Sequence, residues 1–156
     1  PLLLDADALN QMANQKEMLS LLHPNVVLTP HPAEMARLTG EPLEAILSDP
    51  IETARTYAKR WNCVVLLKGA TTCVSDGTQV RLNISGNPGL AKGGSGDVLS
   101  GIITALLAQG LCAFDAASVG AFLLGASADV ALELLRDRAL IARDVIEVVE
   151  RTIEGL

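Results

Sequence analysis

Short apolar runs that alternate with helical patterns limit this chain to a small set of folds. Such runs occupy residues 2–4, 25–29 and 63–68, and segments of helical length separate them. Strands separated by helices pair in parallel, because a parallel connection needs a long crossover. The run CVVLLK at 63–68 is apolar on both faces, which is typical of a central strand. We therefore predict an α/β fold, a three-layer α/β/α sandwich with a mainly parallel central sheet.

Punctuating residues indicate where the helices begin and end. Pro32 suits a first helical turn, Glu34 favours the positive end of that helix, and Gly40 ends it. Asp49-Pro50 opens a second helix with one apolar face, made of Ile51, Ala54, Ala58 and Trp61. Further helices are predicted at about 98–108, 115–136 and 142–152.

The dipeptide Asp76-Gly77 changes the pattern. It lies between the strand-like segments 72–75 and 79–84, and Asp-Gly between such segments is a strong hairpin signal. We expect a β-hairpin over 72–84, which adds antiparallel strands to the sheet.

Charge and composition exclude whole classes of partner. The formal net charge is −6 and only 3% of residues are aromatic, whereas nucleic-acid binding needs basic surface and stacking rings. The longest uncharged run, 98–114, falls short of the ~20 apolar residues of a membrane span. We predict a soluble, cytoplasmic protein that binds neither nucleic acid nor membrane.

The cysteines and the first residues carry two further expectations. Cys63, Cys73 and Cys112 are widely spaced in apolar runs, which favours buried, reduced thiols over a zinc site or a disulfide framework. The chain opens directly on the strand-like PLLLDAD, which suggests a piece of a longer polypeptide.

The glycine-rich segment Gly93-Gly94-Ser95-Gly96-Asp97 precedes an apolar helix. Glycines free the backbone to aim several N–H groups at one point, where the start of the helix adds partial positive charge, so the segment is a candidate phosphate site. Gly-Lys-Ser/Thr is absent, so it is not a P-loop. A plain glycine-rich turn remains the alternative.

Asp97 is ambiguous when taken alone. A carboxylate beside bound phosphate can accept the proton of a hydroxyl that attacks phosphorus. It can equally be a helix cap or a first-turn acid. The nearby Asn87-Pro88-Gly89 reads as a type II turn.

Residues that end the predicted strands are the other candidates. Lys68 could reach a phosphate at the carboxyl edge of the sheet, or extend to solvent. His31, between two prolines, is more typical of a structural residue than of a catalyst. Asp5 and Asp7 could hold Mg²⁺ through water, although capping the next helix is favoured.

Four segments together resemble one family. LLLDADALN, LTPHPAEMARLTG, VVLLKGATT and GNPGLAKGGSGDVLSGIITALLAQG, in this order and over nearly the whole chain, are similar to the ADP/ATP-dependent NAD(P)H-hydrate dehydratases of the ribokinase-like superfamily. The last segment is the most specific. The resemblance implies that residues 1–156 are the C-terminal portion of a single ribokinase-like domain, because family domains have further elements before the DADAL strand.

The resemblance also implies an activity. These enzymes repair the S form of hydrated NADH or NADPH: ADP or ATP, with Mg²⁺, phosphorylates the added hydroxyl, and loss of phosphate restores the ring double bond. A homo-oligomer, a tetramer in the family, is implied, with an NAD(P)H-hydrate epimerase as a functional partner.

The family motifs assign roles by position. Asp97 is the general base and also contacts the substrate. The other residues of the hydrated-cofactor site are His31, Pro32, Ala33, Glu34, Met35, Ala36 and Arg37. The nucleotide-binding residues are Lys68, Gly69, Ala70, Thr71 and Thr72, with Asn87, Pro88, Gly89, Leu90, Ala91, Lys92, Gly93, Gly94, Ser95 and Gly96.

Two positions depart from the family pattern. Lys92 replaces a common threonine and places an extra cation beside the phosphates, and Ala33 stands where many members have glycine. Two other functions stay open: a small-molecule kinase of the same superfamily, acting on a vitamin precursor, and a non-catalytic nucleotide-binding subunit.

Overall fold

A single mixed sheet organises the molecule. In the computed structural model, which describes residues 1–135 and 140–156, five strands follow the order β1-β2-β3-β4-β5. β1, β2 and β3 pair in parallel, whereas the β3–β4 and β4–β5 pairs are antiparallel, so the hairpin is confirmed and the sheet is more evenly mixed than predicted. The strands are β1 Leu2–Leu4, β2 Val26–Leu28, β3 Val64–Leu67, β4 Thr72–Ser75 and β5 Val80–Asn83.

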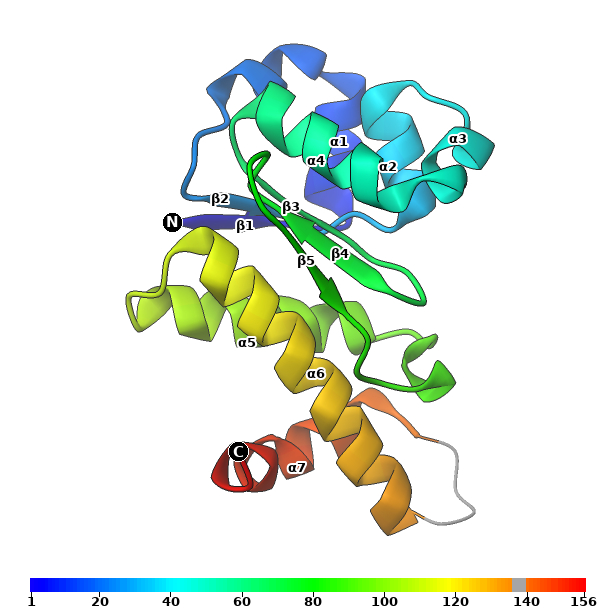
Figure 1. Cartoon of the computed structure of the whole chain (residues 1–156), viewed down its shortest axis with the longest axis vertical. Helices are drawn as coiled ribbons and strands as arrows, with labels where there is room; N and C mark the ends of the chain where they lie inside the picture. Colours follow the sequence, from blue (N-terminus) through cyan, green and yellow to red (C-terminus); the bar gives the residue numbers. More distant parts are fainter. Residues whose placement is uncertain (136–139) are drawn as a thin grey trace.

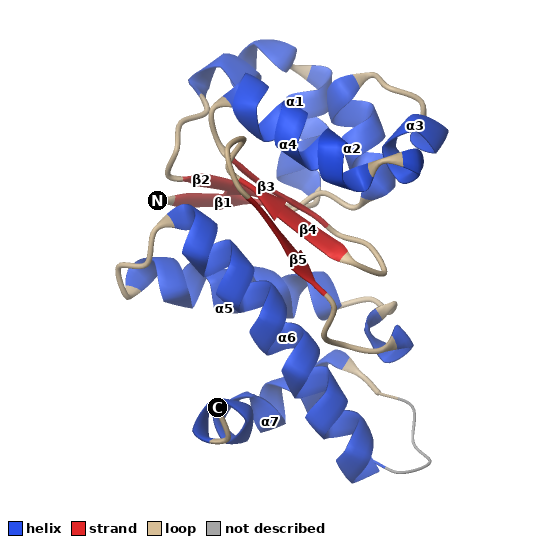
Figure 2. Ribbon diagram, in the orientation of Figure 1, coloured by secondary structure: helices blue, strands red, loops and turns tan. Residues whose placement is uncertain are grey.

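Helices cover both faces of this sheet, so the three-layer prediction is confirmed (Figures 1 and 2). One layer contains α1 Asp7–Asn14, η1 Lys16–Leu21, α2 Pro32–Thr39, α3 Leu43–Ser48 and α4 Pro50–Trp61. The other contains α5 Ser95–Ala108 and α6 Ala113–Leu135, with α7 Ala142–Glu154 packed on α6, and a short η2 at Pro88–Leu90. The predicted helix end at residue 136 lies outside the described residues.

The strand β3 shows why the chain needs two helical layers. Successive side chains of a strand point to opposite faces. Val64 and Leu66 accordingly join the core beneath α5 and α6, whereas Val65 and Leu67 join the core beneath α1, α2 and α4. All four are at most 2% exposed, so β3 is central, as predicted.

The starts and ends of α2 and α4 follow the sequence signals. Gly40 follows the last residue of α2, and the Asp49 carboxylate accepts a hydrogen bond from the Glu52 N–H at the start of α4. The expected inner face of α4 is partly wrong. Ile51 is 41% exposed, and Tyr57 joins Ala54, Ala58 and Trp61 in the core.

The turn of the hairpin is held by one side chain. Oδ1 of Asp76 accepts hydrogen bonds from the backbone N–H of Thr78 and of Gln79, at 2.7 and 2.8 Å. Burial opposes ionisation of Asp76, but these hydrogen bonds outweigh it, and the pKa of the carboxyl lies below its ordinary value. The loop closes tightly enough for β4 and β5 to pair from Ser75 and Val80 onward.

The longest helix, α6, is long and apolar enough to cross a membrane by length and composition. Its buried residues, however, form much of the core beneath the sheet, including Ala117, Ala121 and Ala128. Small side chains along this face let α6 lie close to its neighbours, as expected of a core helix.

The thiols divide into two kinds. Cys63 and Cys73 are buried and free, as predicted, and burial raises the pKa of the Cys63 thiol to about 12. The prediction for Cys112 is wrong, because this residue is exposed. It lies just before α6, where its sulfur accepts a hydrogen bond from the Asp115 N–H at 3.5 Å.

Candidate active site

Three predicted site segments meet at the carboxyl edge of the sheet. Asp5 follows β1, His31 follows β2 by three residues, and Lys68 follows β3. The backbone N–H of Lys68 donates to the Pro30 carbonyl at 2.9 Å, which fixes the ends of β2 and β3 side by side. Open α/β sheets bind ligands at this edge, so the location fits the predicted function.

A lysine links these strand ends. Nζ of Lys68 lies 3.0 Å from Oδ1 of Asp5 and 3.9 Å from Oε2 of Glu34. The Ser100 hydroxyl of α5 donates to the other Asp5 oxygen at 3.1 Å. Lys68 therefore does not simply extend to solvent, and Asp5 does not cap α1 but accepts a hydrogen bond from the Lys68 ammonium. Asp7, the other capping candidate, is the first residue of α1 and makes no side-chain cap.

The ionisation of Asp5 reflects this contact. Burial favours the neutral carboxyl, but the hydrogen bond and charge of Lys68, helped by the Ala6 amide, outweigh it. The net result is that the pKa of Asp5 lies below its ordinary value. The side chains of Lys68 and Asp5 are only 24% and 15% exposed, so the pair is poorly screened by water.

The glycine loop leads into α5 beside this ion pair. A Cβ placed on Gly96 would lie 3.6 Å from Oδ2 of Asp5 and 3.8 Å from Nζ of Lys68. Gly94 is the N-cap residue at φ +93°, a conformation that favours glycine, and no side chain caps the helix. The first amides of α5 therefore have no side-chain acceptor at the point where a lysine ammonium approaches. That is the chemistry of a phosphate site.

Asp97 is the third residue of α5 and is exposed. It does not cap the helix, so of the two plain alternatives only the first-turn acid fits. Its carboxylate is open to a ligand at the same end of α5. Its role as a general base remains a prediction.

The start of α2 is built by a reciprocal capping arrangement. Nδ1 of His31 accepts from the N–H groups of Ala33 and Glu34 at 3.1 and 3.2 Å, and Glu34 Oε2 accepts from the His31 N–H at 2.8 Å. The structural interpretation of His31 is thus confirmed. Further along α2, Met35 is buried in the core, and Arg37 donates to Asn10 of α1 at 3.1 Å.

The loop before α5 is tied down by α6. The Asp129 carboxylate accepts from the Gly86 N–H at 2.9 Å and from Nδ2 of Asn87 at 3.0 Å. Oδ1 of Asn87 in turn accepts from the Gly89 N–H at 3.0 Å. The predicted type II turn is wrong: residues 88–90 form the 3₁₀ turn η2, and φ of Gly89 is not positive. Glycine is required there by space, because a Cβ would lie 2.9 Å from Leu140.

The remaining nucleotide candidates line the open side of the loops. Gly69, Ala70 and Thr71 are exposed between β3 and β4, and Thr72 begins β4. Lys92 and Gly93 are exposed, with no atom within 4 Å of a Cβ built on Gly93. The Cβ of Ala142 at the start of α7 lies 3.1 Å from one built on Gly94. The structure thus brings Gly96 next to Lys68, and the start of α7 lies against the glycine loop at Gly94.

The donor set around this edge bears on the implied Mg²⁺. Among residues 1–135 and 140–156, no three His, Cys, Asp or Glu side chains converge in a way that would hold a metal. A magnesium ion commonly keeps waters and is bound through one or two carboxylates plus substrate phosphates. The residues present fit an ion that arrives with a nucleotide.

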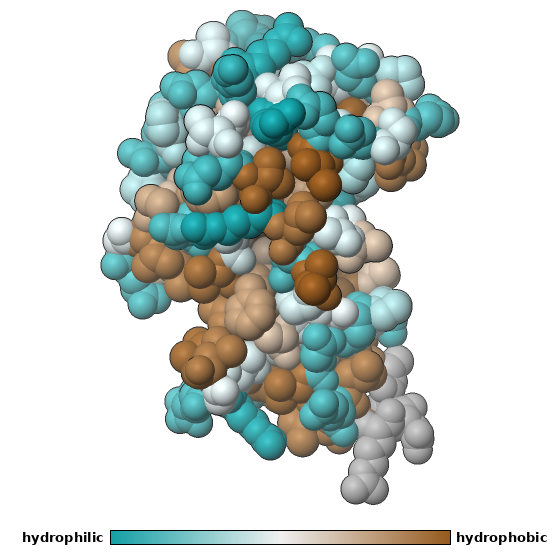
Figure 3. Space-filling model, viewed as in Figure 1, coloured by the Kyte–Doolittle hydropathy of each residue, from teal (hydrophilic) through white to brown (hydrophobic). Residues whose placement is uncertain are grey.

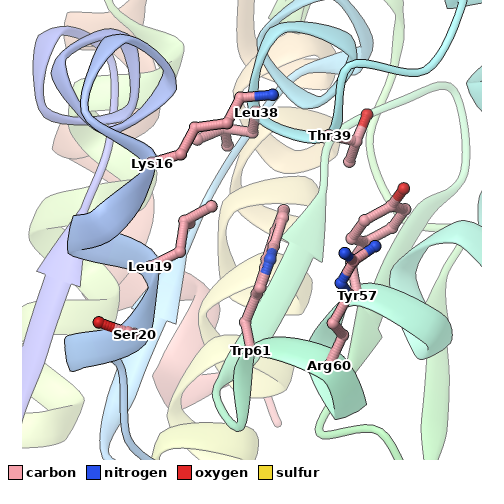
Figure 4. Close-up of a pocket in the computed structure, with 8 residues that line it drawn as sticks. All are labelled: Lys16, Leu19, Ser20, Leu38, Thr39, Tyr57, Arg60 and Trp61. Carbon is pink, nitrogen blue, oxygen red and sulfur yellow. The ribbon is translucent and has the colours of Figure 1, made fainter.

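A separate hollow of about 350 Å³ lies among η1, α2 and α4 (Figure 4). Its walls are the side chains of Trp61, Tyr57 and Leu19, with Lys16 and Arg60 at its margins. None of the predicted site residues lines it.

Sequence reasoning missed three polar residues of the site. It weighed Asp5 only as a metal ligand or a cap, and it assigned nothing to Ser100 or Asp129. A signal existed for Asp5: it and Lys68 both follow apolar runs predicted as parallel strands, whose carboxyl ends share one edge. No local pattern marks Asp129, which reaches the loop across more than forty residues of sequence.

Known proteins with similar sequences point to one family. A 48% identical relative, the ADP-dependent (S)-NAD(P)H-hydrate dehydratase of Neisseria meningitidis, aligns over 85% of this chain and 46% of its own length. The bifunctional NAD(P)H-hydrate repair enzyme of Moorella thermoacetica is 46% identical over 100% of this chain and 30% of its own length. The chain spans less than half the length of these two relatives.

Solved structures show the same fold. The ADP/ATP-dependent NAD(P)H-hydrate dehydratase of Bacillus subtilis, co-crystallised with ATP/Mg²⁺, superposes with a TM-score of 0.82 at 30% identity, over 98% of this chain and 54% of its own. A ribokinase-like superfamily protein of Enterococcus faecalis superposes with a TM-score of 0.80 at 25% identity, over 98% of this chain and 52% of its own. The family model described as NAD(P)H-hydrate dehydratase matches residues 1–150, and the chain therefore belongs to the NAD(P)H-hydrate dehydratase family.

Proposed function

We propose that the complete polypeptide carrying this chain uses ADP or ATP to dehydrate the S form of hydrated NADH or NADPH. One observation carries the proposal: the Lys68 ammonium and the uncapped start of α5 converge beside Gly96. A cation and a helix N-terminus aimed at one point bind phosphate groups. Residues 1–156 are then the C-terminal portion of the dehydratase domain.

Each part of the site has a role in this reaction. Lys68 and the amides of 93–96 hold the transferring phosphoryl group, with the 68–72 and 87–92 loops along the nucleotide. The hydroxyl of the hydrated ring attacks phosphorus while Asp97 accepts its proton, and the shortened nucleotide leaves. Loss of phosphate from the ring carbon, together with a proton from the neighbouring ring carbon, then restores the double bond. Mg²⁺, when bound with the nucleotide, neutralises charge on the phosphates.

The start of α2 is proposed to hold the hydrated nicotinamide. Its His31 side chain is 46% exposed even though Nδ1 is used in capping, so Nε2 stays accessible apart from its 3.5 Å contact with Glu34. The segment lies beside Lys68 through the 3.9 Å approach of Glu34. Substrate and phosphate can therefore meet at one edge of the sheet.

The test is Asp97→Asn in the complete polypeptide. Asparagine keeps the shape of the side chain but accepts a proton poorly, so turnover falls by about 10²–10⁴-fold. Nucleotide affinity holds or rises, because a negative charge beside the phosphates is removed. The assay is recovery of reduced-nicotinamide absorbance from hydrated NADH, with ADP binding measured by calorimetry.

Asp115→Asn is the matched control, because Asp115 is the first-turn acid of α6 as Asp97 is of α5, and it should retain turnover. A phosphorylated product that accumulates without regaining the double bond would identify a kinase. Nucleotide binding without any turnover would identify a binding subunit.

The setting of this activity is part of the same proposal. An NAD(P)H-hydrate epimerase is its functional partner, because the dehydratase acts on one epimer; a bifunctional repair enzyme among the relatives supports this. The three cysteines are free, which fits a reducing compartment, and NADH and NADPH are used in the cytoplasm, so this is the proposed location.

Apolar side chains on one face support a homo-oligomer. Hydrophobic residues gather on the half of the molecule formed by β5 and α5 to α7 (Figure 3). Leu82 of β5 and Ile84, just after that strand, are 49% and 85% exposed, and Val119 and Phe122 of α6 are 36% and 40% exposed. Patches of this kind mark interfaces. Ultracentrifugation should show association that Phe122→Glu weakens; a clean monomer at high concentration would contradict it.

A further inference from the structure

Asp5 lies between the proposed phosphate-binding lysine and the helix that carries Asp97. Its Oδ1 accepts from Nζ of Lys68 at 3.0 Å, and its Oδ2 accepts from the hydroxyl of Ser100 at 3.1 Å. Lys68 follows β3, and Ser100 belongs to the second turn of α5. One carboxylate therefore sets the distance between a strand-end cation and a helix.

The two carboxylates near Lys68 are not equivalent. The 3.9 Å separation from Glu34 is too long for a hydrogen bond, and the same Glu34 oxygen already accepts from the His31 N–H at 2.8 Å. Asp5 is thus the group that fixes the ammonium beside Gly96. Without it, the remaining attraction draws Lys68 toward Glu34 and the start of α2.

The attachment leaves Lys68 able to bind an anion. An ammonium has three N–H donors, and Asp5 takes one at hydrogen-bond distance. The lysine side chain is largely enclosed, at 24% exposed, so it has little freedom to reorient. A held ammonium with free donors is what in-line phosphoryl transfer needs, because such transfer depends on positioning.

We propose that Asp5 is a positioning residue for phosphoryl transfer, which holds the Lys68 ammonium and the first turns of α5 in one alignment. The inference rests on the proposed function and adds to it a residue that touches neither nucleotide nor hydrated cofactor. Ser100 completes the arrangement by orienting the second oxygen of Asp5.

The charge of Asp5 separates this role from a structural one. A carboxylate near bound phosphate lowers the local positive potential, so it does not help an anion to bind. Removing its charge should therefore leave ADP affinity unchanged or increase it, while turnover falls. A residue that only stabilised the fold would lower both together.

The experiment measures both quantities for Asp5→Asn in the complete polypeptide. We expect kcat to fall about 10- to 100-fold, because a misplacement of about 1 Å has effects of that size. The Kd for ADP should stay within about threefold of wild type or decrease. In a Lys68→Met background the change should cause no further loss of kcat, since Asp5 acts through Lys68.

Two further variants keep the test decisive. Asp115→Asn removes a carboxylate from another ion pair, with Arg81 at 2.7 Å, and should leave kcat unchanged. Ser100→Ala retains every charge and should lower kcat about two- to fivefold, so it decides the matter if Asp5→Asn does not fold.

Three results would overturn the role: normal kcat in both Asp5→Asn and Ser100→Ala, an about tenfold loss of ADP affinity in Asp5→Asn, or fully additive losses with Lys68→Met. Wild-type polypeptide that cannot dehydrate hydrated NADH would instead refute the function itself, and the role of Asp5 with it.

Discussion

The contact between α6 and the loop before α5 leaves no room for a side chain at Gly125. A Cβ there would lie 2.6 Å from both the carbonyl carbon and the carbonyl oxygen of Ser85, and closer still to the Ser85 hydroxyl. Real Cβ atoms essentially never approach backbone so closely. In Gly125→Ala the 85–87 segment must therefore move away from α6.

The cost follows from what that movement disturbs. Overpacking of this kind costs about 1–3 kcal/mol. A hydrogen bond to a charged group, such as those from Gly86 and Asn87 to Asp129, contributes about 1.5–3 kcal/mol. Alanine recovers about 1 kcal/mol through its higher helix propensity. The free energy of unfolding should fall by about 2–4 kcal/mol.

Gly101→Ala is the matched control, because Gly101 is an exposed glycine inside α5 with nothing within 4 Å of its Cβ position. It should raise the free energy of unfolding by about 0.5–1 kcal/mol. Urea unfolding followed by circular dichroism measures both variants. If Gly125→Ala is as stable as Gly101→Ala, the close packing of α6 on the loop is wrong.

Three further outcomes can be checked directly. At neutral pH iodoacetamide should modify Cys112 in the folded protein, which mass spectrometry detects. Cys63 should stay unmodified, because it is buried and the pKa of its thiol is raised to about 12. Equal labelling of the two thiols would contradict the burial of Cys63. Asp129→Ala should weaken ADP binding about tenfold by calorimetry, because the loop loses two hydrogen bonds; unchanged affinity would separate the loop from the nucleotide. The pKa of Asp5 is lowered, so its contact with Lys68 stabilises the fold above the ordinary carboxyl pKa of about 3.9, and this stabilisation is lost as pH falls through the lower folded value. The urea midpoint of Asp5→Asn should therefore differ from that of wild type at neutral pH and converge with it in acid. A difference that does not depend on pH would argue against the ion pair.

Much of the architecture was predictable because the signals are local. Apolar runs, prolines, glycines and Asp76-Gly77 placed the strands, the hairpin and α2, α4, α5, α6 and α7 to within a few residues. The helices α1 and α3 are short, at 8 and 6 residues, and segments of that length are marginal as helices on their own. Tertiary packing decides such elements more than sequence does.

Several residues of the site could be predicted from the sequence, but the contacts between them could not. The sequence indicated that Lys68 and the glycine loop would share the carboxyl edge of the sheet, and they do. The contact between Asp5 and Lys68 depends on the strand order. β2 lies between β1 and β3, and the side chains that follow β1 and β3 meet across its end. The turn prediction at Gly89 was wrong because this glycine leaves room for the Leu140 side chain and does not supply a positive φ.

The two cores are contributed by successive parts of the chain, and this orders events during synthesis. Every helix of the first layer, and both partners of the parallel strand pairs, precede residue 68, so β1 to β3 can assemble with one face covered. Within residues 1–156, the opposite face, including Val27, Val64 and Leu66, is covered by α5 and α6, which are made later. Until then the nascent chain presents an apolar sheet surface to its surroundings. Chains emerge at about 5–20 residues per second, and about seventy residues separate the end of β3 from the end of α6. The apolar surface is therefore available to chaperones for several seconds.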